Sequence, residues 1–344
     1  MAKPKRVDIN PTFHFKKKAV HPGENTPEYL EYRRKWEENP KNHIVERVPI
    51  HMDLESTSAC NLKCITCFQS FAPPPRGFMS MELFKKIIDE ASQKGLCSIK
   101  FNFRGEPLLN PNIPQMVKYA KDHGIIEVMF NSNTTLLTEK VANALIDAGL
   151  DKINCSVDAC IPEVYEKIRV GAKFDVVLAN IKNLQRIKKE RGVTKPIVRV
   201  QMVDSPTSHE QVEQYIAFWS EIADQVAVSD VLDWHDKKLE SVVVAEDFVC
   251  AKPYQRMSVW FNGQVVICDG NYFGKIIAGD LNTQSVEEVW NGPVMSKIRR
   301  YHLEGKSHKV KICAECGYRS TTIKQAGLPT RMEKLGEPPF DKME

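Results

Sequence analysis

Three cysteines in one short stretch, Cys60, Cys64 and Cys67, carry thiols that bind metal when ionised. They come directly after a strand-like run, residues 50–56, and so lie on the loop that follows a strand. A cubic 4Fe–4S cluster normally takes four thiolates, so three thiolates leave one iron open to a ligand that is not protein. The spacing predicts a catalytic cluster. The alternative is a zinc site, which usually needs four Cys or His ligands.

A second set of cysteines lies in the C-terminal third of the chain, at Cys250, Cys268, Cys313 and Cys316. Four thiolates suffice for one cluster that the protein closes by itself. A structural zinc ion is again the alternative, because Cys-x-x-Cys pairs are common zinc ligands. A closed cluster has no open iron for substrate, so we expect this one to conduct electrons.

The spacing of the first three cysteines resembles the signature of the radical S-adenosylmethionine (SAM) superfamily. The surroundings of the second set, with Asn262-Gly263 as a hairpin turn and Trp290 after a short helix, resemble the auxiliary-cluster module of the SPASM and twitch subfamily. Four ligands correspond to the twitch arrangement. The module as a whole resembles that of a radical SAM dehydrogenase acting on an aminocyclitol alcohol in antibiotic biosynthesis.

This resemblance implies a chemistry. In the family, the open iron of the first cluster binds SAM, which is cleaved reductively to methionine and a 5'-deoxyadenosyl radical that abstracts a hydrogen atom. We therefore expect oxidation of a secondary alcohol of a sugar, an aminocyclitol or a related small molecule, with one auxiliary 4Fe–4S cluster accepting the electron. An electron donor such as flavodoxin or ferredoxin is the expected partner.

The resemblance also implies the SAM contacts. The Gly-Glu-Pro run at 105–107 resembles the motif that holds the SAM amino group, and stretches at 131–133 and 156–159 resemble the family's Thr-Asn-Gly and Ser-Val-Asp-Gly. The chain departs from the family at Asn133 and Ala159, which replace usual glycines, and at Thr66, where a larger hydrophobe is common. The residues expected at SAM are Gly105, Glu106, Pro107, Asn131, Ser156 and Asp158.

Strand-like and helix-like runs alternate between residues 50 and 236, which is typical of a parallel sheet with right-handed crossovers. Six repeats predict a partial (β/α)6 radical SAM barrel, an α/β fold, with the full eight-stranded barrel as the alternative. The expected strands are 51–56, 97–103, 126–131, 152–157, 196–203 and 225–231, and the expected helices include 81–94, 112–122, 139–148, 176–191 and 210–222.

The strands alternate between an apolar and a polar face. Ile99 and Phe101 share one face of the second strand, while Lys100, Asn102 and Arg104 share the other. Because helices cover the apolar face, we expect the polar face to point into the barrel, and the same reasoning places Arg199 and Gln201 there. Cys97 and Cys155 fall on the apolar face and are expected in the core, together with Phe103.

Candidates for proton transfer follow the last predicted strand, at Asp233 and His235, and His235 has the most suitable intrinsic pKa. We predict a catalytic set of His235, Asp233 and Arg199. Cys160 supports a competing mechanism. In radical SAM epimerases a cysteine thiol returns a hydrogen atom to the substrate radical, and Cys160 follows the fourth strand, near the expected site of that radical.

Peptide modification, which many SPASM enzymes perform, is a third hypothesis. Those enzymes often carry a winged-helix recognition domain, for which the N-terminal extension, 1–49, is too short. This extension predicts one amphipathic helix around residues 29–36, between Pro27 and Pro40. The expected organisation continues with the radical SAM core at 50–236, the auxiliary-cluster module at 237–320 and an exposed tail at 321–344.

Composition limits the alternatives. The 344 residues carry a net charge of +4, too small to indicate nucleic acid binding, and no apolar stretch reaches membrane-spanning length. No apolar run follows the basic N-terminus, as a signal peptide would require. We therefore expect a cytoplasmic protein, in which ten cysteines favour metal binding over disulfides. The sequence leaves the substrate and the oligomeric state open.

Overall fold

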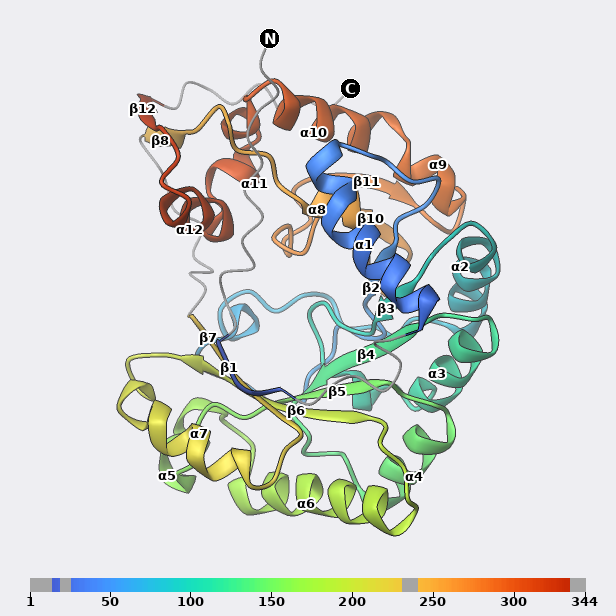
Figure 1. Cartoon of the computed structure of the whole chain (residues 1–344), viewed down its shortest axis with the longest axis vertical. Coiled ribbons are helices and arrows are strands. Elements are labelled where there is room, and N and C mark those ends of the chain that lie inside the picture. The colour runs from blue at the N-terminus through green and yellow to red at the C-terminus, as the bar shows by residue number, and fades with distance from the viewer. Residues whose placement is uncertain (1–13, 19–25, 231–240, 335–344) are drawn as a thin grey trace.

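The computed structural model describes residues 14–18, 26–230 and 241–334. Six parallel strands, β2 to β7, lie side by side in chain order at its centre, and their connecting helices cover the outer face of the sheet (Figure 1). This arrangement confirms the predicted partial barrel and not the eight-stranded alternative. The elements are β2 His51–Leu54, α2 Met81–Gln93, β3 Ser98–Lys100, α3 Ile113–Asp122, β4 Glu127–Ser132, α4 Glu139–Asp147, β5 Lys152–Ser156, α5 Pro162–Ile168, α6 Phe174–Glu190, β6 Ile197–Asp204, α7 Val212–Ser220 and β7 Gln225–Asp230.

Both edges of the barrel sheet are extended by further strands. β1 (His14–Lys18) pairs antiparallel with β7 at one edge. At the other edge β9 (Arg256–Val259) pairs parallel with β2, and β10 (Gln264–Val266) and β11 (Ile277–Asp280) follow, giving one sheet of ten strands. The turn between β9 and β10 holds the predicted Asn262-Gly263, and Gly263 takes the positive φ of 90° that this turn requires. The sheet therefore runs unbroken from the barrel into the C-terminal third.

The remaining C-terminal elements gather at the top of the view in Figure 1. Residues 321–334, expected in an exposed tail, form the end of α12 and strand β12, which pairs with β8. None of the described helices has both the length and the apolar character needed to cross a membrane. The elements are β8 Ser241–Val244, α8 Lys252–Gln255, α9 Val286–Trp290, α10 Pro293–Leu303, α11 Lys311–Ala314, α12 Gly317–Gln325 and β12 Arg331–Lys334.

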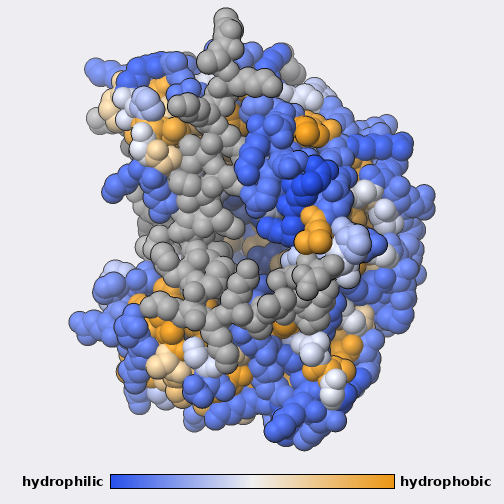
Figure 2. Space-filling view, viewed as in Figure 1, coloured by the Kyte–Doolittle hydropathy of each residue, from blue (hydrophilic) through white to orange (hydrophobic). Residues whose placement is uncertain are grey.

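The predicted N-terminal helix, α1 (Pro27–Asn42), is longer than the sequence pattern indicated and includes both prolines. Thr26 caps its first turn, and the helix ends at His43, which has a φ of 56°. Its buried face joins the base of the barrel, where Ser98 donates a hydrogen bond of 3.0 Å to the Tyr32 hydroxyl. Its outward face is mostly hydrophilic (Figure 2). Strand β1 in the same extension was not predicted.

The alternation of β3 was predicted correctly only for part of the strand. Ile99 and Phe101 are fully buried under the helices, as expected. The strand ends at Lys100, however, and Phe103 turns to line a cavity instead of joining the core, so its predicted place is wrong. Cys97, also expected in the core, is half-buried just before the strand, whereas Cys155 is fully buried.

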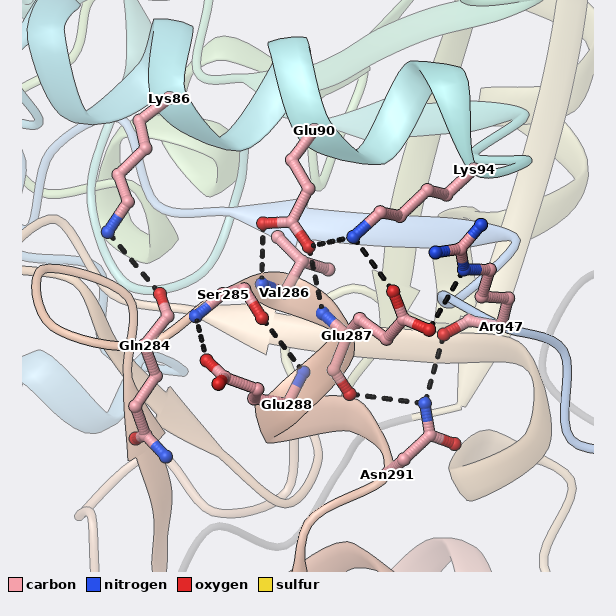
Figure 3. A network of polar contacts seen from close by, with 10 residues as sticks. All are labelled: Arg47, Lys86, Glu90, Lys94, Gln284, Ser285, Val286, Glu287, Glu288 and Asn291. Atoms are coloured by element: carbon pink, nitrogen blue, oxygen red, sulfur yellow. Dashed lines mark hydrogen bonds and ion pairs between the residues drawn. The ribbon is translucent and has the colours of Figure 1, made fainter.

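A polar network connects helix α2 of the barrel to helix α9 of the C-terminal region (Figure 3). The Glu90 carboxylate accepts hydrogen bonds from the first amides of α9, those of Val286 at 2.8 Å and Glu287 at 3.2 Å. Lys94 pairs with both Glu90 and Glu287, at 2.9 and 2.8 Å. A carboxylate at a helix N-terminus satisfies free amides and favours the helix dipole. Glu90 therefore caps a helix that lies far away in the sequence.

Replacing Glu90 with Ala should lower the free energy of unfolding by about 1 kcal/mol at neutral pH, the usual cost of losing a helix cap. Burial raises the pKa of Glu90, but the bonds from Lys94 and the two α9 amides outweigh burial and lower it. A lowered folded-state pKa stabilises the protein above the unfolded-state pKa, and this stabilisation is lost as the pH falls through the folded-state pKa. The difference between Glu90→Ala and the parent in urea unfolding should accordingly shrink in acid.

The matched control for this substitution is Gln93→Ala, which changes an exposed residue near the end of the same helix. We expect it to alter the free energy of unfolding by no more than a few tenths of a kcal/mol. Equal losses for the two variants would contradict the capping role of Glu90.

Candidate functional site

The first cysteine loop lies between β2 and the short 3-10 helix Phe68–Ser70. Hydrogen bonds hold it on the barrel, since Lys63 N donates to Val170 O at 2.9 Å and Ile65 N to Ile168 O at 3.0 Å. Burial, together with the smaller effects of the charges of Glu106, Cys64 and Cys67, raises the pKa of the Cys60 thiol to about 11. The three thiols therefore lie close enough to repel one another when ionised. A cationic group between them would relieve that repulsion.

Arg169, which the sequence did not single out, stands beside this loop. Its Nη1 lies 4.0 Å from Cys64 Sγ, and its Nε donates a 2.6 Å hydrogen bond to Asp158 Oδ2. Asp158, expected at SAM, also accepts from Val203 N at 3.0 Å, so both of its oxygens are bonded within the protein. In this geometry Asp158 holds the Arg169 guanidinium next to the cysteine loop.

The Gly-Glu-Pro run packs directly beneath the cysteine loop. Glu106 N donates to Ala59 O at 2.8 Å, and a Cβ on Gly105 would lie only 2.2 Å from Thr57 O, so only glycine fits there. The buried Glu106 carboxylate accepts from Ser132 Oγ and Asn133 N, each at 2.7 Å. Burial raises the Glu106 pKa, and these donors partly offset the rise. Pro107 begins the following 3-10 helix.

The remaining predicted SAM contacts lie on neighbouring strands. Asn131 lies one residue before the end of β4, and its Oδ1 accepts a hydrogen bond from Asn154 Nδ2 at 2.9 Å, while Ser156 is half-buried at the end of β5. In register, Asn131, Asn154, Arg199 and Gln225 form one row across β4 to β7. Arg199 donates to Gln225 Oε1 at 3.0 Å, and burial lowers its pKa to about 10. The structure therefore holds Arg199 within this polar row.

The second cysteine set also converges. Burial raises the pKa of Cys313 well above its usual value, and the charges of Cys268, Cys316 and Cys250 raise it further. His302 joins two members of the set, since its Nδ1 accepts from Cys250 N at 3.3 Å and its Nε2 lies 3.8 Å from Cys313 Sγ. Burial lowers the pKa of His302 to about 3, so the ring stays neutral. No sequence pattern had indicated this histidine.

Arg319 provides a test of whether a cluster fits here. The side chain is 2% exposed, and its Nη1 and Nη2 are buried with no hydrogen-bond partner among the described residues. Its own amide donates to Cys316 Sγ at 3.4 Å. Buried donors are expensive to leave unpaired, and the sulfur atoms of an anionic cluster are suitable acceptors. The second cysteine set therefore fits an iron–sulfur cluster.

A single zinc ion fits the two sets less well. Within the described ranges, no three Cys, His, Asp or Glu side chains are placed to share one metal ion. A cube of iron and sulfur separates its thiolate ligands more widely than one ion does.

A cavity of about 300 Å³ lies between the barrel and the C-terminal region. The barrel contributes Lys100, Asn102 and Asn131 to its wall, and the C-terminal region contributes Lys252, Tyr272 and Cys316. Tyr272 also touches the first cysteine loop, because its ring centroid lies 4.9 Å from that of Phe68. The cavity is therefore lined by one cysteine of the second set, Cys316, and by Tyr272, which packs against the 3-10 helix that follows the first cysteine loop.

Several predicted site residues lie elsewhere. Arg104, expected on the face that points into the barrel, is not among the described residues that line the cavity. It forms a buried ion pair with Glu55 at 2.6 Å and stacks 3.6 Å from the Trp260 ring, because the chain turns after β3. Cys160 is buried in the core cluster. Gln201 is half-buried on β6. Asp233 and His235 lie outside the described residues, as does the predicted boundary at 236.

Two protein-family models match the chain. The radical SAM superfamily model covers residues 54–203, and the iron–sulfur cluster-binding domain model named SPASM covers residues 250–317. The matches contain the first and the second cysteine set respectively.

Curated relatives match mainly the barrel. A tungsten-containing aldehyde ferredoxin oxidoreductase cofactor-modifying protein of Pyrococcus furiosus is 30% identical over 196 residues, 56% of this chain and 54% of the relative. A probable GTP 3',8-cyclase of Methanococcus maripaludis is 38% identical over 129 residues, 37% of this chain and 43% of the relative. The chain thus spans about half the length of these relatives.

Solved structures share the fold. BtrN in complex with AdoMet and 2-DOIA has a TM-score of 0.52 at 21% identity, covering 79% of this chain and 94% of that chain. Streptococcus suis SuiB bound to the precursor peptide SuiA has a TM-score of 0.62 at 17% identity, covering 86% and 78%. The chain therefore carries a radical SAM domain over residues 54–203 and a SPASM iron–sulfur cluster-binding domain over residues 250–317.

Proposed function

We propose that this enzyme oxidises a secondary alcohol of a sugar, an aminocyclitol or a related small molecule. The observation that carries the proposal is the cavity between the barrel and the C-terminal region. Its wall includes Cys316, so a substrate bound there lies next to the second set. A volume of about 300 Å³ is at the small end of ligand pockets, which favours a small molecule over a peptide chain.

Oxidation of an alcohol to a ketone removes a hydrogen atom from carbon, a proton from oxygen and one further electron. SAM bound at a cluster held by Cys60, Cys64 and Cys67 would supply the chemistry that takes the hydrogen atom, and a cluster held by Cys250, Cys268, Cys313 and Cys316 would take up the electron. The polar cavity would hold the alcohol, and Tyr272 in its wall packs against Phe68. As proton acceptors we retain Asp233 and His235, and as electron donor a flavodoxin or ferredoxin.

Epimerisation through Cys160 receives less support from the geometry. Cys160 packs among buried apolar side chains and is absent from the described residues that line the cavity. Peptide modification has one supporting likeness, the fold shared with SuiB, which was solved with a precursor peptide.

The first experiment is anaerobic reconstitution followed by iron analysis. We expect about eight irons per chain, because two cubic clusters contain four each. Cys316→Ala should reduce the content to about four irons, keep SAM cleavage to deoxyadenosine and abolish alcohol oxidation, because the electron acceptor is lost. Cys97→Ala, a cysteine of neither set, is the control and should keep the full iron content. About four irons in the parent protein would overturn the two-cluster proposal.

The second experiment separates oxidation from epimerisation. Cys160→Ala should leave product formation within about twofold of the parent, since a buried cysteine that tolerates Ala contributes only packing. The product should be two hydrogens lighter than the substrate by mass spectrometry. Continued release of deoxyadenosine without product in Cys160→Ala would favour the epimerase.

A further inference from the structure

The cavity between the barrel and the C-terminal region is unusually rich in charge. Charged side chains reach it from three strands and from the loops around the second cysteine set. Among the described residues, the cations are Lys100, Lys252, Arg256 and Lys275, and the anions are Asp53, Asp269 and Glu315.

Each carboxylate of this cavity already has a cationic partner. Lys252 Nζ lies 2.5 Å from Asp269 Oδ1, and Arg256 Nη1 lies 3.5 Å from Asp53 Oδ2. Lys275 Nζ lies 3.8 Å from Glu315 Oε2. These pairs neutralise three of the four cations and leave Lys100.

Lys100 makes neither a hydrogen bond nor an ion pair through its ammonium with any residue that the structure describes. It lies on β3 directly beside Asp53 of β2, whose carboxylate bonds instead to His51 at 3.4 Å and to Arg256. Burial lowers the Lys100 pKa, and although Asp53 and Asp269 raise it, Arg256 and Arg199 lower it further. The cavity wall therefore holds an ammonium that has no ion-pair partner among the described residues, and burying such a group is energetically costly.

A second donor near Lys100 also lacks an acceptor. Arg256 Nε is buried without a hydrogen-bond partner among the described residues, although the same guanidinium pairs with Asp53 through Nη1. Unpaired buried donors in a cavity indicate a ligand that supplies acceptors.

We propose that the substrate enters this cavity with an anionic oxygen group, a carboxylate or a phosphate, that binds Lys100. A hydrogen bond between an ammonium and an anionic oxygen is stronger than one between neutral groups, and it fixes the orientation of the ligand. The inference rests on the proposed function and narrows its substrate class. A substrate with an amine at this position would add a cation beside Lys100 and Arg256, so amino sugars and aminocyclitols, whose amines are protonated at neutral pH, should be excluded there.

Covalent labelling of lysines provides a test that needs no turnover. The reconstituted protein is treated with an amine-acylating reagent, and the rate at Lys100 is measured by peptide mass spectrometry. Lys182, exposed on α6, is the internal reference. The first matched ligands are glucuronate, glucose and glucosamine, which share one sugar ring but carry a negative, no and a positive charge. The second comparison is inorganic phosphate against chloride at equal ionic strength.

We expect glucuronate or phosphate to slow the labelling of Lys100 at least threefold, while glucose and glucosamine leave it unchanged and Lys182 reacts equally throughout. No slowing by any anion, or equal slowing by glucosamine, would overturn the proposal. Slowing by SAM alone would also overturn it, because Lys100 would then belong to the SAM site. Alcohol oxidation is measured in a separate assay. A failure of the proposed function can therefore be distinguished from a failure of anion binding at Lys100.

A pair of variants extends the test to affinity. Lys100→Met should weaken binding of the protecting anion at least tenfold, and Lys100→Arg should recover part of the loss because it keeps the charge. Unchanged affinity in Lys100→Met would contradict the proposal. Iron content of both variants at the parent level verifies that they fold.

Discussion

The parallel pairing of β2 with β9 determines where both cysteine sets lie. β2 leads directly into the first cysteine loop, while the hairpin of β9 and β10 leads to Cys268. Glu55 reinforces the joint at the end of β2, because its amide donates to Val259 O and its carboxylate accepts from Phe261 N and pairs with Arg104. Removing one partner of such a buried ion pair typically lowers the free energy of unfolding by about 3–5 kcal/mol. The separation of the two sets thus depends on main-chain hydrogen bonds and one buried ion pair.

Local patterns in the sequence predicted much of this fold. Cysteine spacing, strand alternation and the Asn262-Gly263 turn all express constraints among residues close in sequence. They located the six barrel strands, five of their helices and the hairpin. They did not locate β1, which has little alternation of its own, or the short helix α5. The length of β3 was overestimated because the chain turns after Lys100 to place Phe103 at the cavity.

The site residues that the sequence missed act through partners distant in the chain. Arg169 reaches Cys64 across 105 residues, and His302 reaches Cys250 across 52. No spacing rule predicts such contacts, because they depend on how helices pack against the loops. Asp158 illustrates the converse case. Its position matched a family stretch, yet its carboxylate bonds to Arg169 and the Val203 amide, so its effect on the site is exerted through a neighbour.

The two extended edges of the sheet have a consequence for how the chain folds during synthesis. A partial barrel of β2 to β7 has two open edges, which β1 covers on one side and β9 on the other. β1 is synthesised before β7, so it is available as soon as β7 has formed. By contrast β9, which covers the edge at β2, is synthesised some 200 residues after β2. During that interval the β2 edge presents unpaired amides and carbonyls, the condition under which strands aggregate. Completion of the C-terminal hairpin of β9 and β10 therefore also ends the period in which the barrel is prone to aggregate through the β2 edge.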